Sequence, residues 1–556
     1  MELAWAQGWS GFMLTYATAQ APMLVGLVRS RAAAYDYVTS PIVAATLSAV
    51  TGLGMAAATP FMSGLGATPH GLVHVALGTL VSATLGYAAG RGGSDDPKRP
   101  VHQRGSVVEE SPRRSERSRR DLERPRAQEL TLAGTPVPNH DETKHFKLVG
   151  TTGTGKSTAI RELLSAALAR GDRAVIADPD GGYLRKFYDA ERGDVILNPF
   201  DERSVKWDLF GEIRNAYDVD QLARSLIPDH EGSDRSWRGY ARTFFTAVTR
   251  QANDGGVKDL GELYRLLVAA DTKELRALLE GTAAQPFLNE HNNKMFDSIR
   301  SVTSSAVEAV EYVAKQEAPR FSIRDWIGGE AKGVLFIPYK AGQIAALRST
   351  ISAWMRIAIF ETMNLDEQPD ERGSDGVRRL WFVVDELDAL GQIDGLKDAL
   401  ARLRKFGGRC VLGFQSVAQV STTYGHGDAH TIVENCGNSL ILRCSSSEGG
   451  GTARFASQLI GDREVVRTTS SRSRRDTEFF GSVSTSEMIK VEAAVLPSQI
   501  EQLPDLAGYL KLASDPRWRR VRLEAIPESD RRWDESRKRD LGRHGDERKR
   551  EGASRD

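Results

Sequence analysis

The chain has 556 residues, more than one ordinary domain needs, and it balances 74 basic against 74 acidic residues. It is long enough for two or three folded units, and its neutral balance excludes a globally basic nucleic-acid binder, so any nucleic-acid surface must be local. The cysteines, Cys410, Cys436 and Cys444, are too few for a disulfide framework and lack zinc-ligand spacing, which indicates buried thiols in a reducing cytosol.

The N-terminal region is poor in charge. Residues 41–90 contain no charged side chain and divide at SGLGATP into two stretches, each with roughly the 20 residues that a membrane-spanning helix needs. We expect a transmembrane hairpin over residues 38–92, with a buried helical hairpin as the alternative. Basic residues on both flanks predict that both ends lie in the cytoplasm. Residues 1–37 form the preceding segment, in which 3–28 predict an interfacial helix.

Two other segments have the composition of disordered chain. Residues 93–140 and 526–556 mix many charges with few apolar side chains, so they bury too little surface to fold. We expect a charged linker and a disordered tail. Attraction of the Arg-rich linker to anionic lipid or DNA is the alternative for 93–140.

The stretch KLVGTTGTGKST fits the pattern G-x-x-x-x-G-K-[ST] between an apolar strand, FKLV, and a helix. Its glycines let backbone N–H groups close around phosphate oxygens, Lys156 can reach the β and γ phosphates, and Ser157 can offer its hydroxyl to Mg²⁺. The N-terminus of the helix points at the phosphates. The predicted nucleotide-binding residues are Gly150, Thr151, Thr152, Gly153, Thr154, Gly155, Lys156, Ser157 and Thr158.

Further apolar runs predict a sheet. RAVIADPD, DVILNPF, GVLFIPY, RCVLGFQS, SLILRCS and GYLKLAS, with FKLV and LWFVV, would build about eight strands of an α/β fold. Between residues 207 and 318 helical periodicity replaces this pattern. We therefore expect an all-α domain inserted into a nucleotide-binding domain that comprises residues 141–206 and 319–525.

A second motif follows the predicted strand over residues 380–384, in RLWFVVDELDAL. Asp385 and Glu386 emerge at the carboxyl end of this strand, where α/β sheets place their ligands. Asp385 would hold Mg²⁺, directly or through water, and Glu386 would polarise the attacking water as a general base. The pair favours hydrolysis over binding alone; an acidic helix start is the alternative. Gln415 ends the next predicted strand and could sense the γ-phosphate or position water.

The spacing of the two motifs narrows the class of protein. About 230 residues separate Lys156 from Asp385, far more than the few βαβ units of small kinases and GTPases. The sequence also lacks the LSGGQ-type signature that an ABC transporter needs.

Besides the phosphate loop, the sequence contains the stretches DPDGGYLRKFYD, GDVILNPFD, FVVDELDAL, GFQSVAQV and VLPSQIEQLPDLAGYLKLASDP. Over about residues 140–525 the sequence resembles the TraD/TrwB branch of type IV secretion coupling proteins, and the resemblance rests on the phosphate loop and on these stretches. The resemblance implies a RecA-like domain in a homo-hexamer at the bacterial inner membrane, where the chain is multi-pass with its bulk in the cytoplasm. It implies a DNA-dependent ATPase that uses ATP and Mg²⁺. Its partners would be DNA in a central channel, a relaxase within its relaxosome, and components of the secretion channel.

The same resemblance gives Arg404 a role. In the family an arginine acts as a finger, and Arg404 occupies the matching position in GLKDALARLRKFGG. In a ring it would meet the γ-phosphate charge of the neighbouring subunit's nucleotide. The sequence predicts that Leu396, Leu400 and Leu403 face inward on this helix. The alternative for Arg404 is a cation that stabilises the helix dipole.

DNA contacts are predicted at two places, with rival functions left open. SDRSWRGYAR mixes Arg235, Arg238 and Arg242 with Trp237, although a solvated helix face is the alternative, and residues 467–486 predict a flexible basic loop. One rival function is an FtsK/HerA-like DNA translocase that is not tied to secretion. The other is a nucleotide-gated membrane receptor that does not pump.

Overall fold

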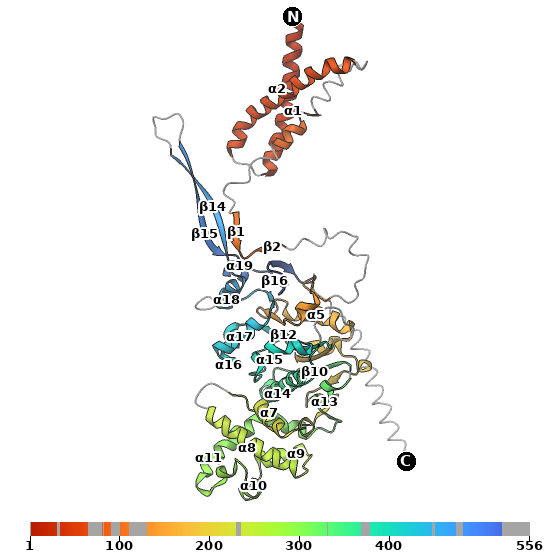
Figure 1. Ribbon diagram of the computed structural model, residues 1–556, viewed down its shortest axis with the longest axis vertical. Coiled ribbons are helices and arrows are strands. Elements are labelled where there is room, and N and C mark those ends of the chain that lie inside the picture. The colour runs from red at the N-terminus through yellow and green to blue at the C-terminus, as the bar shows by residue number, and fades with distance from the viewer. Residues whose placement is uncertain are drawn as a thin grey trace. The chain divides into compact units, whose positions relative to one another are not determined.

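The computed structural model describes residues 2–30, 34–64, 80–81, 83–89, 101–110, 130–229, 235–330, 332–368, 378–446, 451–473 and 482–524 (Figure 1). The chain divides into two compact units. One comprises residues 1–105 and 463–492, and the other comprises 106–462 and 493–556. The predicted disordered tail, 526–556, lies outside the described residues.

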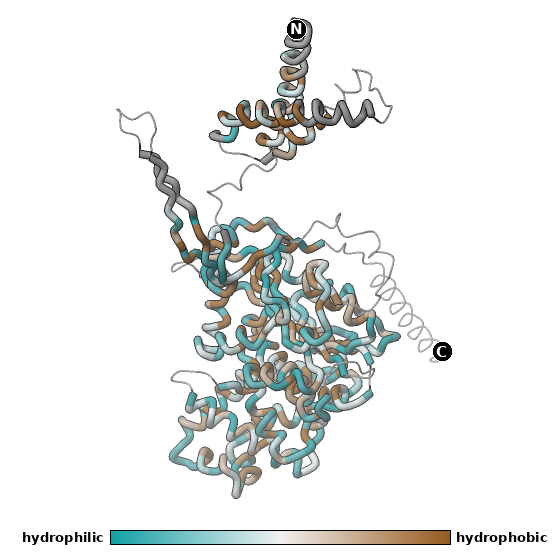
Figure 2. Tube along the Cα trace, turned by 45° about the horizontal axis from the view of Figure 1, so that its top comes forward, coloured by the Kyte–Doolittle hydropathy of each residue, from teal (hydrophilic) through white to brown (hydrophobic). Residues whose placement is uncertain are grey.

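The first unit begins with two long helices, α1 (Glu2–Ser30) and α2 (Ala34–Gly64). They pack through Met23 and Leu27 of α1 and Ala44 of α2, and Figure 2 shows hydrophobic residues along both. Helix α2 covers the first predicted span, whereas the second is described only at 80–81 and 83–89, which are helical. Within these described ranges, no helix combines the length and the hydropathy that a membrane crossing requires.

The first unit also contains a three-stranded sheet, ordered β1-β14-β15. Its strands are β1 (Val101–Gly105), β14 (Asp462–Ser473) and β15 (Ser482–Ala493). Arg104 pairs with Glu464, and Glu492 with both Arg463 and Arg467. Two predictions were therefore wrong: the linker 93–140 is folded at 101–110 and 130–140, and the described parts of the loop 467–486 are strands. Pairing between distant segments satisfies the backbone and the charges, which local composition does not reveal.

The second unit is built on a sheet in which the described residues form ten strands, ordered β2-β17-β16-β13-β5-β12-β11-β6-β10-β7. The seven strands from β13 to β7 are parallel, β16 runs antiparallel to both β13 and β17, and β2 pairs in parallel with β17. In this order the strands are Val108–Glu110, Trp518–Arg522, Ala507–Lys511, Asn438–Ile441, Phe146–Val149, Gly408–Phe414, Leu380–Val384, Arg173–Pro179, Val334–Tyr339 and Val195–Ile196. All eight predicted apolar runs are strands of this sheet; β2 and the arginine-rich β17 were not predicted.

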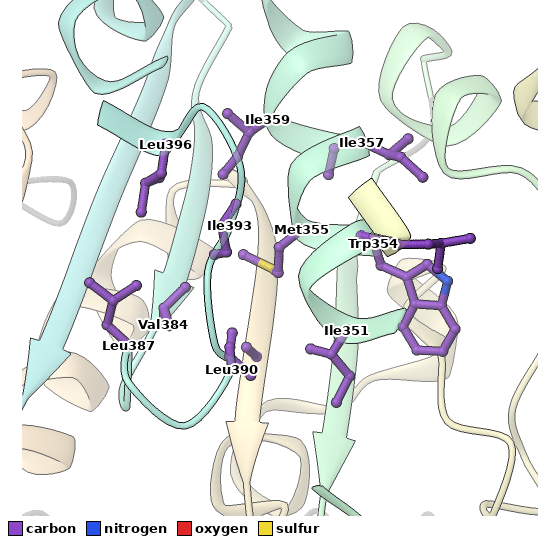
Figure 3. Packing of buried hydrophobic residues seen from close by; sticks show 14 of the residues in the cluster. Ile351, Trp354, Met355, Ile357, Ile359, Val384, Leu387, Leu390, Ile393 and Leu396 are labelled. Atoms are coloured by element: carbon purple, nitrogen blue, oxygen red, sulfur yellow. The ribbon is translucent and has the colours of Figure 1, made fainter. Parts of the chain in front are cut away.

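Helices cover both faces of this sheet. Helix α5 (Lys156–Ala169) packs on one face, where Ile160 and Leu164 join a buried cluster with Ile176. Helix α14 (Ile344–Met363) packs on the other face. Figure 3 shows its side chains in the same cluster as Val384 and Leu390, at and beyond the end of β11. The central strands are therefore buried on both sides, which is why they read as continuous apolar runs.

A helical segment is inserted between two short strands, β8 (Lys206–Trp207) and β9 (Arg320–Phe321), which pair in parallel and close the insertion at its base. Its buried side chains, such as Phe244 and Leu263, belong to the same cluster as the α14 face of the sheet. The segment thus shares its core with the sheet, and the boundaries 207 and 318 stay a prediction. Its helices are α7 (Ala216–Leu226), α8 (Arg235–Asp254), α9 (Leu260–Val268), α10 (Thr272–Leu278), α11 (Asn293–Ala306) and α12 (Glu308–Ala314).

Shorter elements complete the second unit. A small hairpin, β3 (Thr131–Leu132) and β4 (Thr135–Pro136), precedes β5. The remaining α-helices are α4 (Asn139–Glu142), α6 (Gly182–Phe187), α13 (Ile323–Gly328), α15 (Leu396–Arg402), α16 (Val417–Tyr424), α17 (His426–Asn435), α18 (Gly451–Ile460) and α19 (Pro497–Glu501). Short 3₁₀ turns occur at 190–192, 210–212, 285–288, 290–292 and 403–406.

A buried histidine ties the phosphate-loop strand to α15. His145, just before β5, donates from Nε2 to the carbonyl oxygen of Leu400 at 2.9 Å, and its Nδ1 accepts the N–H of Cys410 at 3.0 Å. Both bonds require the neutral ring. The pKa of His145 is lowered to about 4, mainly by burial; the hydrogen bond to Leu400 acts in the opposite direction, and the charges of Arg409 and Arg404 contribute to the lowering.

The pKa of His145 predicts an acid-sensitive fold. The folded pKa lies below that of an unfolded histidine, so the stabilisation is present above about pH 6.5 and is lost as pH falls toward 4. A shift of this size corresponds to about 3 kcal/mol. We expect His145→Gln to flatten the pH dependence of thermal unfolding in this window. His291→Gln, which removes an exposed imidazole, serves as the control; equal slopes in both variants would contradict the prediction.

Candidate nucleotide site

The phosphate loop, residues 150–155, joins β5 to α5 at the carboxyl edge of the parallel strands. A Cβ atom on Gly150 would lie 2.8 Å from Leu442 Cβ and 2.8 Å from Thr154 Oγ1, so only glycine fits there. Gly155 caps α5 with a φ of 118°, in the left-handed region. The loop therefore keeps its backbone close to the start of α5, as a phosphate cradle requires.

Lys156 reaches back across its own loop. Its Nζ donates to the carbonyl oxygen of Gly150 at 2.7 Å and lies 3.4 Å from that of Thr151. Burial lowers the pKa of Lys156, while the carboxylates of Asp385 and Glu386 act in the opposite direction. A bound phosphate would offer this ammonium group a charged partner in place of the neutral carbonyl oxygens.

Asp385 meets Ser157 at the end of β11. The hydroxyl of Ser157 donates to Asp385 Oδ2 at 2.7 Å, so the structure brings these two residues, both predicted as metal ligands, into contact. Asp385 Oδ1 is buried and has no hydrogen-bond partner in the described part of the chain. A hydroxyl and an unpartnered carboxylate oxygen fit the oxygen preference of Mg²⁺. No cluster of three or more His, Cys, Asp or Glu occurs among the described residues.

The predicted base is linked to the phosphate loop through Gln415. Thr152 Oγ1 donates to Gln415 Oε1 at 3.1 Å, and Gln415 Nε2 donates to Glu386 Oε1 at 3.2 Å. Burial raises the pKa of Glu386, the charge of Asp385 raises it further, and the amide of Gln415 lowers it. A raised pKa suits a carboxylate that must accept a proton.

Two residues of the site were given no role from the sequence. The hydroxyl of Tyr183 donates to Asp385 Oδ2 at 2.7 Å, and Asp178 accepts the backbone N–H groups of Tyr183 and Leu184. Burial raises the pKa of Tyr183 well above its ordinary value, as does the charge of Asp385, so the hydroxyl keeps its proton. Burial raises the pKa of Asp178 to about 7. The only sequence signal was their place in DPDGGYL.

Arg404 lies elsewhere. It is exposed in the turn after α15, four residues before β12 begins, at the amino edge of the parallel strands. The phosphate loop follows the opposite edge, about 20 Å away along a strand of this length. Arg404 therefore does not reach the site of its own chain. Leu396, Leu400 and Leu403 are buried, as predicted.

The candidate DNA-contact residues on α8 are partly engaged within the chain. Arg242 pairs with Asp229 at 2.5 Å, and Arg238 lies 3.5 Å from the carbonyl oxygen of Pro228. Trp237 packs against the buried cluster, and Arg235 is exposed. DNA contact at these residues stays a prediction.

The sheet, the phosphate loop and the carboxylates at its carboxyl edge define a P-loop nucleotide-binding protein. A family described as the type IV secretion-system coupling protein DNA-binding domain matches residues 129–524. The chain belongs to this family of type IV secretion-system coupling proteins.

Individual relatives agree. The chain is 32% identical to coupling protein TraD of Escherichia coli strain K12 over 390 residues, which cover 69% of this chain and 53% of TraD. It thus spans about half the length of TraD. The structure of plasmid coupling protein TrwB in complex with ADP and Mg²⁺ is similar with a TM-score of 0.66 at 32% identity, covering 79% of this chain and 98% of that one. TrwB in complex with the ATP analogue ADPNP has a TM-score of 0.66, 32% identity and coverage of 78% and 96%.

Proposed function

We propose that the chain is a DNA-dependent ATPase that couples a relaxase–DNA complex to a type IV secretion channel and pumps DNA during conjugative transfer. One observation carries the proposal: polar and charged side chains from two motifs far apart in the sequence, and from the end of a third strand, converge at one edge of the sheet. They are Lys156, Ser157, Asp385, Glu386 and Gln415. TrwB, which is similar in structure, binds ADP with Mg²⁺ and ADPNP.

Each residue has a role that its contacts support. Lys156 would turn from its own loop to the β and γ phosphates of ATP, and Ser157 and Asp385 would hold Mg²⁺. The ion would neutralise charge on the phosphate oxygens. Glu386 accepts the proton of the attacking water, and Gln415 fixes the orientation of Glu386 between the loop and β12.

A ring of subunits would complete the site. Arg404 is exposed at the sheet edge opposite the phosphate loop, so it could meet only the nucleotide of a neighbouring copy. Head-to-tail contact of this kind generates a ring when the rotation between successive subunits closes. We propose a homo-hexamer with DNA in its channel, in which Arg404 neutralises transition-state charge in trans.

We also propose that residues 38–92 anchor the chain in the bacterial inner membrane. On α2, Val38, Ile42 and Leu53 are 75%, 69% and 72% exposed, which in water is an unfavourable arrangement of apolar side chains. We expect the full chain to stay in the membrane pellet after an alkaline carbonate wash. Release into the supernatant would contradict the placement.

The activity is tested with the full chain in detergent. We expect Mg²⁺-dependent ATP hydrolysis that DNA stimulates, and a loss of about 10²- to 10³-fold in Lys156→Ala, because a phosphate-stabilising charge is removed. Lys147→Ala alters a buried lysine that bonds only main-chain carbonyl oxygens in the described structure, and purified folded protein with that change should retain Mg²⁺-dependent turnover. Hydrolysis that ignores DNA would point instead to a nucleotide-gated receptor.

The trans role of Arg404 has a sharper test. Arg404→Ala should lower hydrolysis by about 10³-fold, whereas Arg402→Ala, which removes another exposed arginine two residues earlier, should not. Mixed with Lys156→Ala, Arg404→Ala should regain activity, because one variant supplies the arginine and the other the intact loop. Mixtures as inactive as the separate variants would rule out a finger in trans.

A further inference from the structure

Tyr183 bridges the ends of two neighbouring strands. Val384 of β11 pairs with Ala177 of β6, so the carboxylates of Asp385 and Asp178 follow side by side at the edge of the sheet. The backbone N–H of Tyr183 donates to Asp178 at 3.1 Å, and its hydroxyl donates to Asp385 Oδ2 at 2.7 Å. Tyr183 thus bonds both carboxylates: its backbone N–H donates to Asp178, and its hydroxyl donates to Asp385.

The backbone conformation of the turn before α6 places Tyr183 between Asp178 and Asp385. Asp180 and Gly181 both have left-handed backbone, with φ of 58° and 67°. The N–H of Asp180 donates to the carbonyl oxygen of Tyr339 on the neighbouring strand β10 at 2.8 Å, which anchors the turn. A non-glycine residue with positive φ is uncommon and costly, and such backbone persists where its surroundings over-determine it. Here the strained turn positions the side chain of Tyr183, which is 2% exposed.

The contact sets the rotation of the Asp385 carboxylate. Oδ2 accepts two hydroxyl groups, from Ser157 and Tyr183, whereas Oδ1 is buried and unpartnered among the described residues. Two donors on one oxygen fix the plane of the group, with Oδ2 turned toward both Ser157 and Tyr183. Ser157 itself is a predicted metal ligand, so only the Tyr183 contact is independent of the ion.

We propose that Tyr183 is a positioning residue for Mg²⁺, which holds the Asp385 carboxylate turned toward the other predicted metal ligand, Ser157, before nucleotide arrives. The inference rests on the proposed ATPase function. Tyr183 touches no phosphate and takes part in no proton transfer; it acts through Asp385. Outer-shell partners of this kind typically contribute 10- to 100-fold to metal affinity.

The test measures metal affinity without turnover. Binding of N-methylanthraniloyl-ADP to the full chain is titrated with MgCl₂, and separately measured in EDTA. We expect Tyr183→Phe to raise the Mg²⁺ concentration for half-maximal enhancement by about tenfold or more, and to leave the affinity in EDTA within about twofold. Tyr424→Phe is the matched control, because it also removes a buried hydroxyl, one that bonds only to the backbone of Ile393 and Gly391.

Two results of this titration would contradict the role proposed for Tyr183. An unchanged Mg²⁺ midpoint in Tyr183→Phe overturns the inference, and so does an equal loss of affinity with and without Mg²⁺, which would indicate a structural role. In an Asp385→Asn background the further effect of Tyr183→Phe should disappear, because the two residues act as one unit. A wild-type chain whose ADP binding ignores Mg²⁺ would overturn the proposed function, and this inference with it.

Discussion

Parallel register at the centre of the sheet is the constraint on which the rest of the structure depends. Val149 pairs with Phe414, and Val384 with both Leu412 and Ala177, so four strands end at the same edge. Every element of the nucleotide site leaves the sheet there. Ser157 and Asp385 are 228 residues apart in sequence, and they come within a hydrogen bond because the strands that precede them, β5 and β11, run parallel with only β12 between them.

Helix α14 extends this arrangement to the helical segment. Ser352 donates to the carbonyl oxygen of Leu390 in the loop after β11, and Ser349 donates to that of Ala306 at the end of α11. Arg356 of the same helix is buried and bonds Gln221 of α7. The loop that follows Asp385 is thus connected to the inserted helices through one packed helix, with one continuous core around it.

The fold was predictable where burial leaves a local pattern. Strands buried on both faces must be apolar throughout, so the eight central runs could be read directly. Strands β1, β14 and β15 carry arginines and glutamates that are paired across the sheet, as in Glu492 with Arg463. Strand β1 pairs with residues of β14 that lie more than 300 positions away in the sequence. A local window of sequence therefore does not reveal which segments pair. Composition therefore indicated a linker and a loop where the chain folds.

The sequence by itself determined the chemistry of the site, because a phosphate loop and an acidic strand end are local patterns whose spacing dictates which atoms can bind phosphate and metal. These local patterns alone identified Lys156, Ser157, Asp385 and Glu386 as candidate site residues. Only the tertiary structure decided that Tyr183 contacts Asp385 and that Arg404 lies at the opposite edge from its own site. Those placements depend on strand order and direction, which long-range pairing sets and sequence spacing does not encode.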